Sequence, residues 1–250
     1  MTAPLVSLHT SGRIATLTLR RPEARNALSI PLLADLHAAL DSLATNTALS
    51  VLVLTGEGKS FCAGMDLKAV LNDPEAPLQL LTSLADACLK VRALPLVTLA
   101  KVSGAAIGGG CGLTCVCDIS ITHADSKMGF PEVDLGVCPA VVAPWLVRKV
   151  GPGKARCILL QGGLLSGQQA FDLGLVDSLV PTAADLDAAT SKIADRLATG
   201  GPQALAATKA LLNKLDNSLD PTLSREGAAL SAQVLALPEA QSMLRAKLGT

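Results

Sequence analysis

Residues 105–118 read AAIGGGCGLTCVCD, a stretch with four glycines within five positions. Gly108 to Gly110 stand between an apolar run typical of a strand and a run typical of a helix, and Gly112 falls inside that expected helix. Glycine costs a helix interior about 1 kcal/mol relative to alanine, so each of these positions needs a reason. A strand that ends in glycines and opens a helix is typical of an α/β fold, and it exposes main-chain N–H groups.

The order strand, loop, helix recurs along the chain. Strand patterns occupy 5–9, 13–19, 50–55, 95–102, 117–122 and 176–181. Helical spacing occupies 31–44 and 77–93, with further helices after 109 and 132, and glycine-containing loops follow the third, fourth and fifth strands. From about residue 184 onward the strand patterns stop, and DLDAATSKIADRLA, PQALAATKALLNKL and LSREGAALSAQVLAL each predict a helix. We therefore expect an α/β core over 1–184 and a C-terminal helical region over 185–250.

Composition excludes several classes of protein. Basic and acidic residues number 21 each, so no strong field attracts nucleic acid or an anionic membrane. We find neither a leader pattern nor an apolar stretch of the roughly 20 residues that cross a bilayer, which predicts a cytoplasmic protein. The seven cysteines indicate reduced core residues rather than disulfides. Cys111, Cys115 and Cys117 lack a matching second pair of ligands, so no metal site is expected.

Two glycine-containing loops can act on the same oxygen. TGEGKSFCAGMDL at 55–67 and SGAAIGGGCG at 103–112 each follow a strand and precede a helical pattern. If both face one cavity, each offers an N–H to a developing oxyanion, and one such donor is worth about 2.7–4 kcal/mol. Tight structural turns are the alternative for either loop alone. The dinucleotide fingerprint fits poorly, and no Walker loop is present because no G-K-[ST] has the required spacing.

Five pieces of the chain together resemble the crotonase superfamily, the enoyl-CoA hydratase/isomerase family. They are RPEARNAL (21–28), VLTGEGKSFCAGMDL (53–67), KVSGAAIGGGCGL (101–113), CDISITHADSKMGFPEVDLGVCPA (117–140) and LLSGQQAFDLGLVDSLVP (164–181). The resemblance implies a crotonase-like spiral of repeated β-β-α units. It also implies that the C-terminal helical region packs subunits into a homotrimer or a dimer of trimers. An acyl-CoA thioester is the implied substrate, and no separate cofactor is expected because coenzyme A is part of that substrate.

The resemblance also assigns site residues. The oxyanion donors fall on the backbone N–H groups of Met65 and Gly109. The residues implied to hold substrate or coenzyme A are Arg25, Ala27, Ala63, Gly64, Asp66, Leu67, Gly108 and Gly110. For Arg25, which would lie near a phosphate, a solvated surface charge is an equal alternative.

One of two glutamates implied by the resemblance is missing. Members that hydrate a double bond normally carry two, and here the second falls on Glu132 whereas the first falls on Gly112. Asp134 is the nearest substitute by sequence, with a structural or capping role as its better interpretation, and Cys111 and Cys138 are weaker substitutes. Asp118 is expected to satisfy backbone donors at a turn.

Three functions remain open from the residues. Because a positioned acid or base contributes about 10²–10⁴-fold, a single carboxylate favours an isomerase in which Glu132 alone moves the proton. The sequence around 132–151 resembles hydratases, and we favour hydration of the 2,3 double bond of an enoyl-CoA. A catalytically silent protein that binds coenzyme A or RNA is the alternative of another class.

Overall fold

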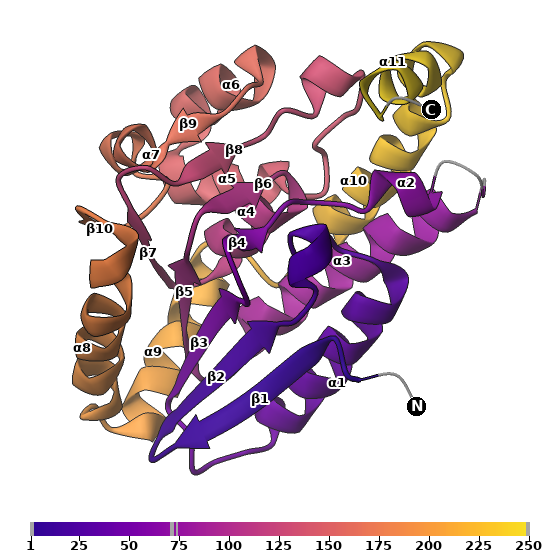
Figure 1. The fold of residues 1–250 in the computed structure, drawn as a ribbon. Helices are drawn as coiled ribbons and strands as arrows, with labels where there is room; N and C mark the ends of the chain where they lie inside the picture. Colours follow the sequence, from indigo (N-terminus) through magenta and orange to yellow (C-terminus); the bar gives the residue numbers. More distant parts are fainter. Residues whose placement is uncertain (1–2, 71–72, 74, 249–250) are drawn as a thin grey trace.

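The structure is a computed structural model that describes residues 3–70, 73 and 75–248. Within these residues the main sheet has six strands, in the spatial order β1 (Val6–Ser11), β2 (Ile14–Leu19), β3 (Val51–Gly56), β5 (Val97–Val102), β7 (Ile119–His123) and β10 (Ser178–Val180). The first two form an antiparallel hairpin, and the later neighbours pair in parallel. Parallel neighbours need crossover connections, and the intervening helices supply them (Figure 1).

A smaller sheet lies above the main one. Its described strands are β4 (Ser60–Cys62), β6 (Ala105–Ile107), β8 (Lys127–Gly129) and β9 (Leu165–Ser166), with the first three parallel and the last antiparallel. The helices between the strands are α1 (Ile30–Ala44), α2 (Leu67–Val70), α3 (Ala76–Ala93), α4 (Gly109–Val116), α5 (Ala143–Val150), α6 (Pro152–Gln161) and α7 (Gly167–Leu173). Three successive turns of the chain, which begin at β3, β5 and β7, thus each add one strand to the main sheet, one strand to the smaller sheet and then helix.

This repeat confirms the expected β-β-α spiral, but each of the three expected glycine-containing loops contains a short strand, β4, β6 or β8. The stretch 103–110, expected as a loop after a single strand, contains β6, which pairs with both β4 and β8. A three-residue strand of small residues is too short for a pattern of alternating burial to reveal it. Two helices have capped N-termini, because Ser29 Oγ accepts from Leu32 N and Ser166 forms a capping box with Gln169.

Alternation along β3 explains why helices cover both faces of the main sheet. Val51 and Val53 belong to an apolar cluster with the helix α8 (Leu186–Ala198). Leu52 and Leu54 point to the opposite face, where α1 and α3 complete the larger core. The strand is buried on both faces, as expected for a parallel strand between helical layers.

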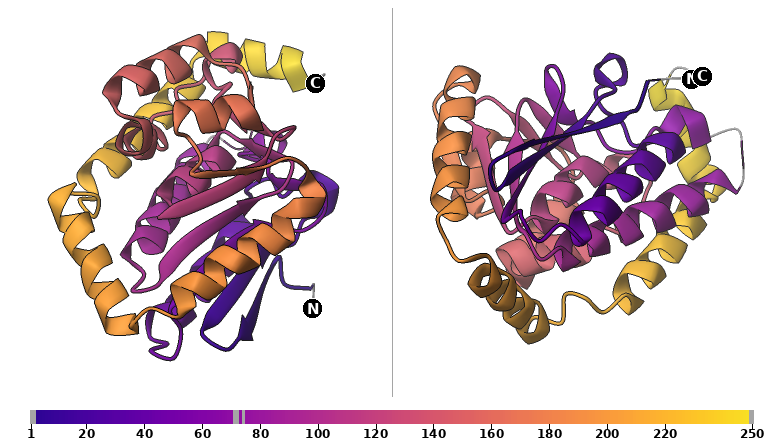
Figure 2. Two further views of the ribbon diagram at one scale, coloured as in Figure 1. Left: turned by 90° about the vertical axis from the view of Figure 1, so that its left-hand side faces the viewer. Right: turned by 90° about the horizontal axis from the view of Figure 1, so that it is seen from below.

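The C-terminal helices wrap the same core. After α8 come α9 (Pro202–Leu215), α10 (Thr222–Leu235) and α11 (Pro238–Leu248), the last of which the sequence patterns missed. In Figure 2, α8 lies across the strands of the main sheet, and α10 contacts α3. In the part of the chain that the structure describes, none of the helices combines the length and apolarity needed to cross a membrane.

Candidate active site

The turn after β4 presents a backbone N–H group to a pocket. Leu28 pairs with Met65 as an isolated parallel bridge, in which Leu28 N donates to Gly64 O at 2.7 Å and Asp66 N donates to Leu28 O at 2.9 Å. In parallel pairing these bonds go to the neighbours of the bridged residue. The N–H of Met65 therefore points away from Leu28.

The turn after β6 presents a second N–H group. Gly108, with φ 53 and ψ −119, donates its own N–H to Gly129 O, and α4 begins at Gly109. The first bond within the helix runs from Gly112 N to Gly108 O at 2.9 Å, so the N–H of Gly109 lies in the first turn without an intrahelical acceptor. The helix dipole adds partial positive charge at this end.

The two turns are in contact. A Cβ added to Gly64 would lie 2.8 Å from Ile107 O and 3.8 Å from the backbone nitrogen of Gly109. Neither Met65 N–H nor Gly109 N–H donates to an acceptor within the described residues. The fold therefore brings together the free N–H groups of Met65 and Gly109, which lie about forty residues apart in the sequence. The loops at 55–67 and 103–112 must face each other in this way if both are to donate to one oxygen.

Glu132 brings a carboxyl group to the same place. It precedes the short 3-10 helix η2 (Val133–Leu135), and its backbone oxygen accepts from Leu135 N and Val137 N. A Cβ added to Gly108 would lie only 2.8 Å from Glu132 Oε1, so the missing side chain at Gly108 makes room for this carboxyl.

Burial perturbs the Glu132 carboxyl strongly. The residue as a whole is half-buried, but Oε2 is enclosed and has no hydrogen-bond partner within the described residues. Loss of hydration raises the pKa of Glu132 from 4.5 to about 7. A carboxyl with such a pKa can both accept and donate a proton near neutral pH.

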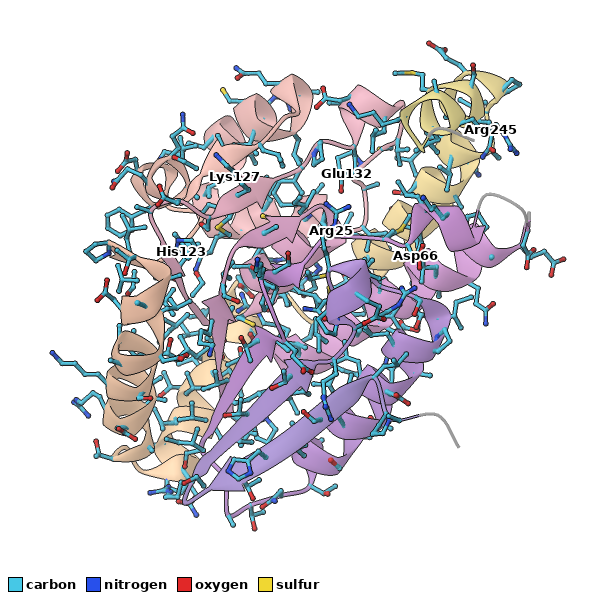
Figure 3. All side chains as sticks on the ribbon, viewed as in Figure 1. Arg25, Asp66, His123, Lys127, Glu132 and Arg245 are labelled. Carbon is cyan, nitrogen blue, oxygen red and sulfur yellow. The ribbon has the colours of Figure 1, made fainter. Side chains whose placement is uncertain are left out.

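These groups line one small cavity of about 90 Å³. Its walls are otherwise largely apolar. They include side chains from α2, α3, β6, η2 and the segment after η2: Leu67, Leu81, Leu84, Ile107, Leu135, Val137, Val141 and Val142. Ser231 of α10 also lines it, which means that the C-terminal helical region completes the pocket wall. Figure 3 labels Glu132 together with Arg25 and Asp66, which come from three segments far apart in the sequence.

The residues expected to hold coenzyme A divide into two groups. Ala63, Gly64, Leu67 and Gly108 line the cavity. Gly110 does not appear in its lining, and a Cβ there would lie 2.2 Å from the backbone oxygen of Cys62. Gly110 thus lets α4 pack closely against β4.

Of the other expected residues, Arg25 and Ala27 lie in the turn that begins near residue 21, and Asp66 follows Met65 in the segment after β4. Arg25 is exposed and has a left-handed backbone with φ 53, and its backbone oxygen accepts from Ala63 N. Arg21, which sequence reasoning missed, donates from Nη1 to Asp66 Oδ2 at 2.7 Å and to Ala27 O at 3.1 Å. This arginine joins the turn to the Asp66 segment. No pattern in the sequence distinguishes it from the adjacent Arg20.

The resemblance implies the first glutamate at position 112, but a neighbouring side chain fills the space beside Gly112. A Cβ on Gly112 would lie 2.3 Å from Cγ1 of Val142. Asp134, the nearest substitute by sequence, is exposed and accepts from Gly163 N at 2.7 Å, which supports its structural interpretation. Burial raises the pKa of the Cys111 thiol and that of Cys138, so neither thiol is readily ionised.

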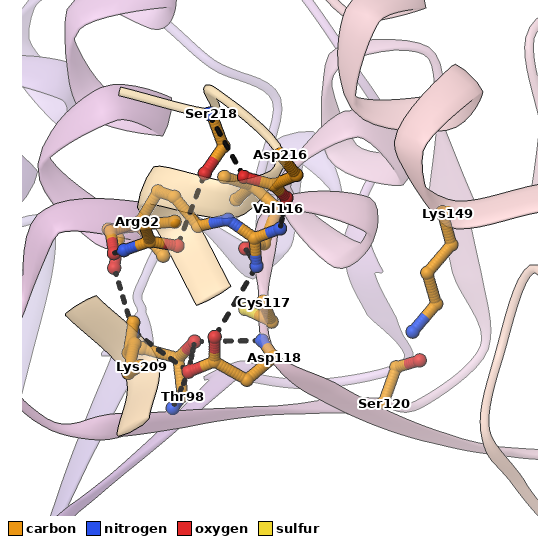
Figure 4. A network of polar contacts seen from close by, with 12 residues as sticks. Arg92, Thr98, Val116, Cys117, Asp118, Ser120, Lys149, Lys209, Asp216 and Ser218 are labelled. Carbon is orange, nitrogen blue, oxygen red and sulfur yellow. Dashed lines mark hydrogen bonds and ion pairs between the residues drawn. The ribbon is translucent and has the colours of Figure 1, made fainter. Parts of the chain in front are cut away.

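Asp118 accepts from a backbone N–H, as expected, and it also forms ion pairs with two basic side chains. Its Oδ2 accepts from Thr98 N at 2.8 Å, which confirms the interpretation as a partner of backbone donors. The same carboxylate pairs with the buried Lys209 of α9 at 2.8 Å and with Arg92 at 3.3 Å (Figure 4). The network anchors the end of α4, because Arg92 also donates to Val116 O. Cys117, beside it, is buried, as are Cys111 and Cys115.

Comparisons with known proteins identify the family of this chain. A family model described as Enoyl-CoA hydratase/isomerase matches residues 9–241. The 2,3-dehydroadipyl-CoA hydratase of Escherichia coli (strain K12) is 35% identical over 86% of this chain and 84% of its own length. The crotonyl-CoA hydratase of Syntrophomonas wolfei subsp. wolfei is 32% identical over 90% of this chain and 87% of its own length.

Solved structures agree as well. The crystal structure of an enoyl-CoA hydratase from Mycobacterium avium matches with a TM-score of 0.88 at 29% identity, covering 99% of this chain and 97% of its own. The two sheets joined in a β-β-α spiral are thus the crotonase fold. The family model spans most of the chain, and relatives above 30% identity cover more than two thirds of it. The chain belongs to the enoyl-CoA hydratase/isomerase family.

Proposed function

We propose that this protein adds water across the 2,3 double bond of an enoyl-CoA thioester. The observation that carries this proposal is the unpartnered Oε2 of Glu132, enclosed in the pocket that both turns line. The names of the relatives, which include crotonyl-CoA and 2,3-dehydroadipyl-CoA hydratases, support hydration as the reaction.

A single carboxylate can complete the reaction. Ionised Glu132 accepts a proton from a water molecule whose oxygen bonds to C3, while the electrons of the double bond move toward the thioester. The thioester oxygen gains negative charge and accepts hydrogen bonds from Met65 N–H and Gly109 N–H, each worth about 2.7–4 kcal/mol in such a site. Glu132 then returns the proton to C2. One water is consumed, no electron is transferred, and the carboxylate is regenerated, so we expect no cofactor beyond the coenzyme A of the substrate.

The coenzyme A moiety is proposed to lie along the turns that lead into the pocket. Main-chain groups of Ala63, Asp66 and Leu67 are the proposed contacts near the adenine, with Ala27 and Gly64 beside them. Arg25 supports this placement because its exposed guanidinium is available to a phosphate. Gly108, which lines the cavity, is proposed to let the backbone approach the thioester.

Isomerisation is a second candidate, and one observation favours it. Because Val142 fills the space at Gly112, the described part of the pocket has no second carboxylate to hold water. Glu132 alone could then move a proton from C2 to C4 of a 3-enoyl-CoA.

The test is to incubate the protein with 2-enoyl-CoA and 3-enoyl-CoA and to determine product mass and double-bond position. A product heavier by one water supports hydration, whereas an unchanged mass with a moved double bond supports isomerisation. Glu132→Gln is expected to reduce turnover about 10²–10⁴-fold, because the amide cannot accept the proton. Tight acyl-CoA binding without any reaction would contradict both and favour a silent binding protein.

Assembly and location are proposed on the same basis. We expect a homotrimer or a dimer of trimers, supported by the exposed leucines of α9 and α10. A cytoplasmic location is supported by the seven cysteines, which form no disulfide among the described residues.

A further inference from the structure

Val142 and Gly112 form a contact that leaves no room for a side chain at position 112. A Cβ on Gly112 would lie 2.3 Å from Val142 Cγ1 and 2.9 Å from Val142 Cβ, both far below van der Waals separation. Valine is branched at Cβ and has few alternative rotamers, so it cannot turn aside as a long flexible side chain does. The glycine within α4 is therefore the partner of this valine.

The backbone of Val142 is held in place as well. Val142 N donates to Pro139 O at 3.2 Å, and Leu146 N donates to Val142 O at 3.1 Å at the start of α5. Val142 is only 2% exposed, and its neighbour Val141 is equally buried. Both valines line the pocket that contains Glu132.

The Val142 side of the pocket cannot hold a water molecule by itself. An ordered water needs two to four polar partners. Among the described lining side chains, the hydroxyl of Ser231 is already engaged, because it donates to Cys138 O at 2.7 Å and accepts from Ala140 N at 3.2 Å. The free carboxyl oxygen belongs to Glu132, so a reacting water depends on this one side chain.

We propose that Val142 determines the outcome of the reaction in this pocket. Its side chain takes the space that a group at residue 112 would need and replaces a water-holding wall with hydrocarbon. This inference rests on the proposed function, because it concerns how the same enoyl thioester divides between water addition and movement of the double bond.

A second activity follows from that arrangement. With 2-enoyl-CoA, Glu132 removes a proton from C4, and the thioester oxygen bears the charge of the resulting dienolate. The same carboxyl then protonates C2, so that the double bond moves from C2–C3 to C3–C4 and no atom is gained. Because water is held weakly beside Val142, this route competes with hydration.

The decisive variants are Val142→Thr and the matched control Val176→Thr, at a valine outside the pocket lining. Each replaces a methyl group by a hydroxyl of similar size in a side chain that is 2% exposed, so the cost of burying the hydroxyl is comparable. With 2-enoyl-CoA as substrate, we expect Val142→Thr to raise the initial ratio of hydrated to isomerised product about threefold to tenfold, the effect of one hydrogen bond to water. Val176→Thr should leave this ratio near that of the wild type.

The outcomes are distinct. An active wild type whose product ratio changes equally, or not at all, in the two threonine variants overturns the role of Val142 and leaves the proposed function intact. A wild type that converts neither 2-enoyl-CoA nor 3-enoyl-CoA overturns the proposed function and this inference with it.

A second measurement tests the contact without activity. Gly112→Ala should lower the melting temperature, and Gly112→Ala combined with Val142→Ala should recover part of the loss because the added methyl then has space. Strictly additive effects of the two substitutions would show that Val142 does not occupy the space of residue 112, and would overturn the inference.

Discussion

Burial raises the pKa of Glu132 from 4.5 to about 7, because an ionised oxygen enclosed by apolar side chains loses its hydration. The neighbouring Gly108 makes this burial possible, since a Cβ there would lie 2.8 Å from Oε1. The buried position of the Glu132 carboxyl thus depends on the absence of a side chain at Gly108. Ionisation of the Glu132 carboxyl should therefore change both the activity and the stability of the protein with pH.

The first profile is that of activity. Hydration requires Glu132 to accept a proton, so kcat/KM should rise with pH and reach half its maximum near the pKa of about 7. Steady-state rates with 2-enoyl-CoA across the neutral range measure this. A rate that does not change between about pH 5 and 9 would show that ionisation of Glu132 does not control the reaction.

The second profile is that of stability. Both states of the protein bind the Glu132 proton below pH 4.5, and only the folded state keeps it between 4.5 and about 7. The free energy of unfolding should therefore fall as pH rises through this window and then level off. Relative to the wild type, Glu132→Gln should gain about 2–3 kcal/mol over the same window.

Urea unfolding of the wild type and of Glu132→Gln at several pH values measures this difference. The matched control is Glu23→Gln, which removes an exposed carboxyl from the turn near residue 22. If both substitutions give the same pH dependence, burial of Glu132 is not its cause.

At the scale of the element, α4 depends on glycine for several separate reasons. Gly108 adopts a positive φ before the helix, Gly110 allows contact with β4, and Gly112 faces Val142. The sequence suggested a single purpose for the three consecutive glycines, the approach of backbone to a thioester oxygen. The structure adds close packing of the helix on the small sheet.

Gly110→Ala should destabilise the protein, because its Cβ would lie 2.2 Å from the backbone oxygen of Cys62, which cannot move without shifting β4. We expect a loss of about 1–3 kcal/mol in the free energy of unfolding. Gly153→Ala in α6 is the control, since nothing lies within 4 Å of its added Cβ and helix propensity favours alanine. Chemical denaturation of both variants checks this, and equal stability would contradict the tight contact.

At the scale of the whole molecule, the C-terminal helices have two faces. Buried residues hold them to the core, such as Lys209 of α9, which pairs with Asp118. The outer face of α9 is apolar, with Leu211 57% exposed and Leu215 74% exposed. Exposed leucines four residues apart lie on one side of a helix and favour contact with another surface.

Replacing Leu211 and Leu215 together by Glu should lower the mass of the assembly, because charge would then enter the proposed subunit contact. Sedimentation equilibrium measures the mass, with Leu78→Glu on α3 as a control at an exposed leucine outside the C-terminal helices. A double variant that keeps the wild-type mass would exclude this face of α9 from the interface.

Much of the fold and of the candidate site could be predicted from local sequence patterns. The strand and helix patterns, the two glycine turns and Glu132 are local features, and the family resemblance joined them into a β-β-α spiral that the structure confirms. Missed features depend on partners distant in sequence or on very short elements. They include the three-residue strand β6 and the ion pairs of Arg21 with Asp66 and Lys209 with Asp118.

By itself, the sequence determined the family, the two turns that offer N–H groups, and the absence of a carboxylate at residue 112. Local residue types and their order suffice for such features. Only the tertiary structure decided that Glu132 is enclosed beside Gly108 and that Val142 fills the space at Gly112. Burial and steric exclusion depend on which segments pack together, and the fold brings these segments together across about thirty residues of chain.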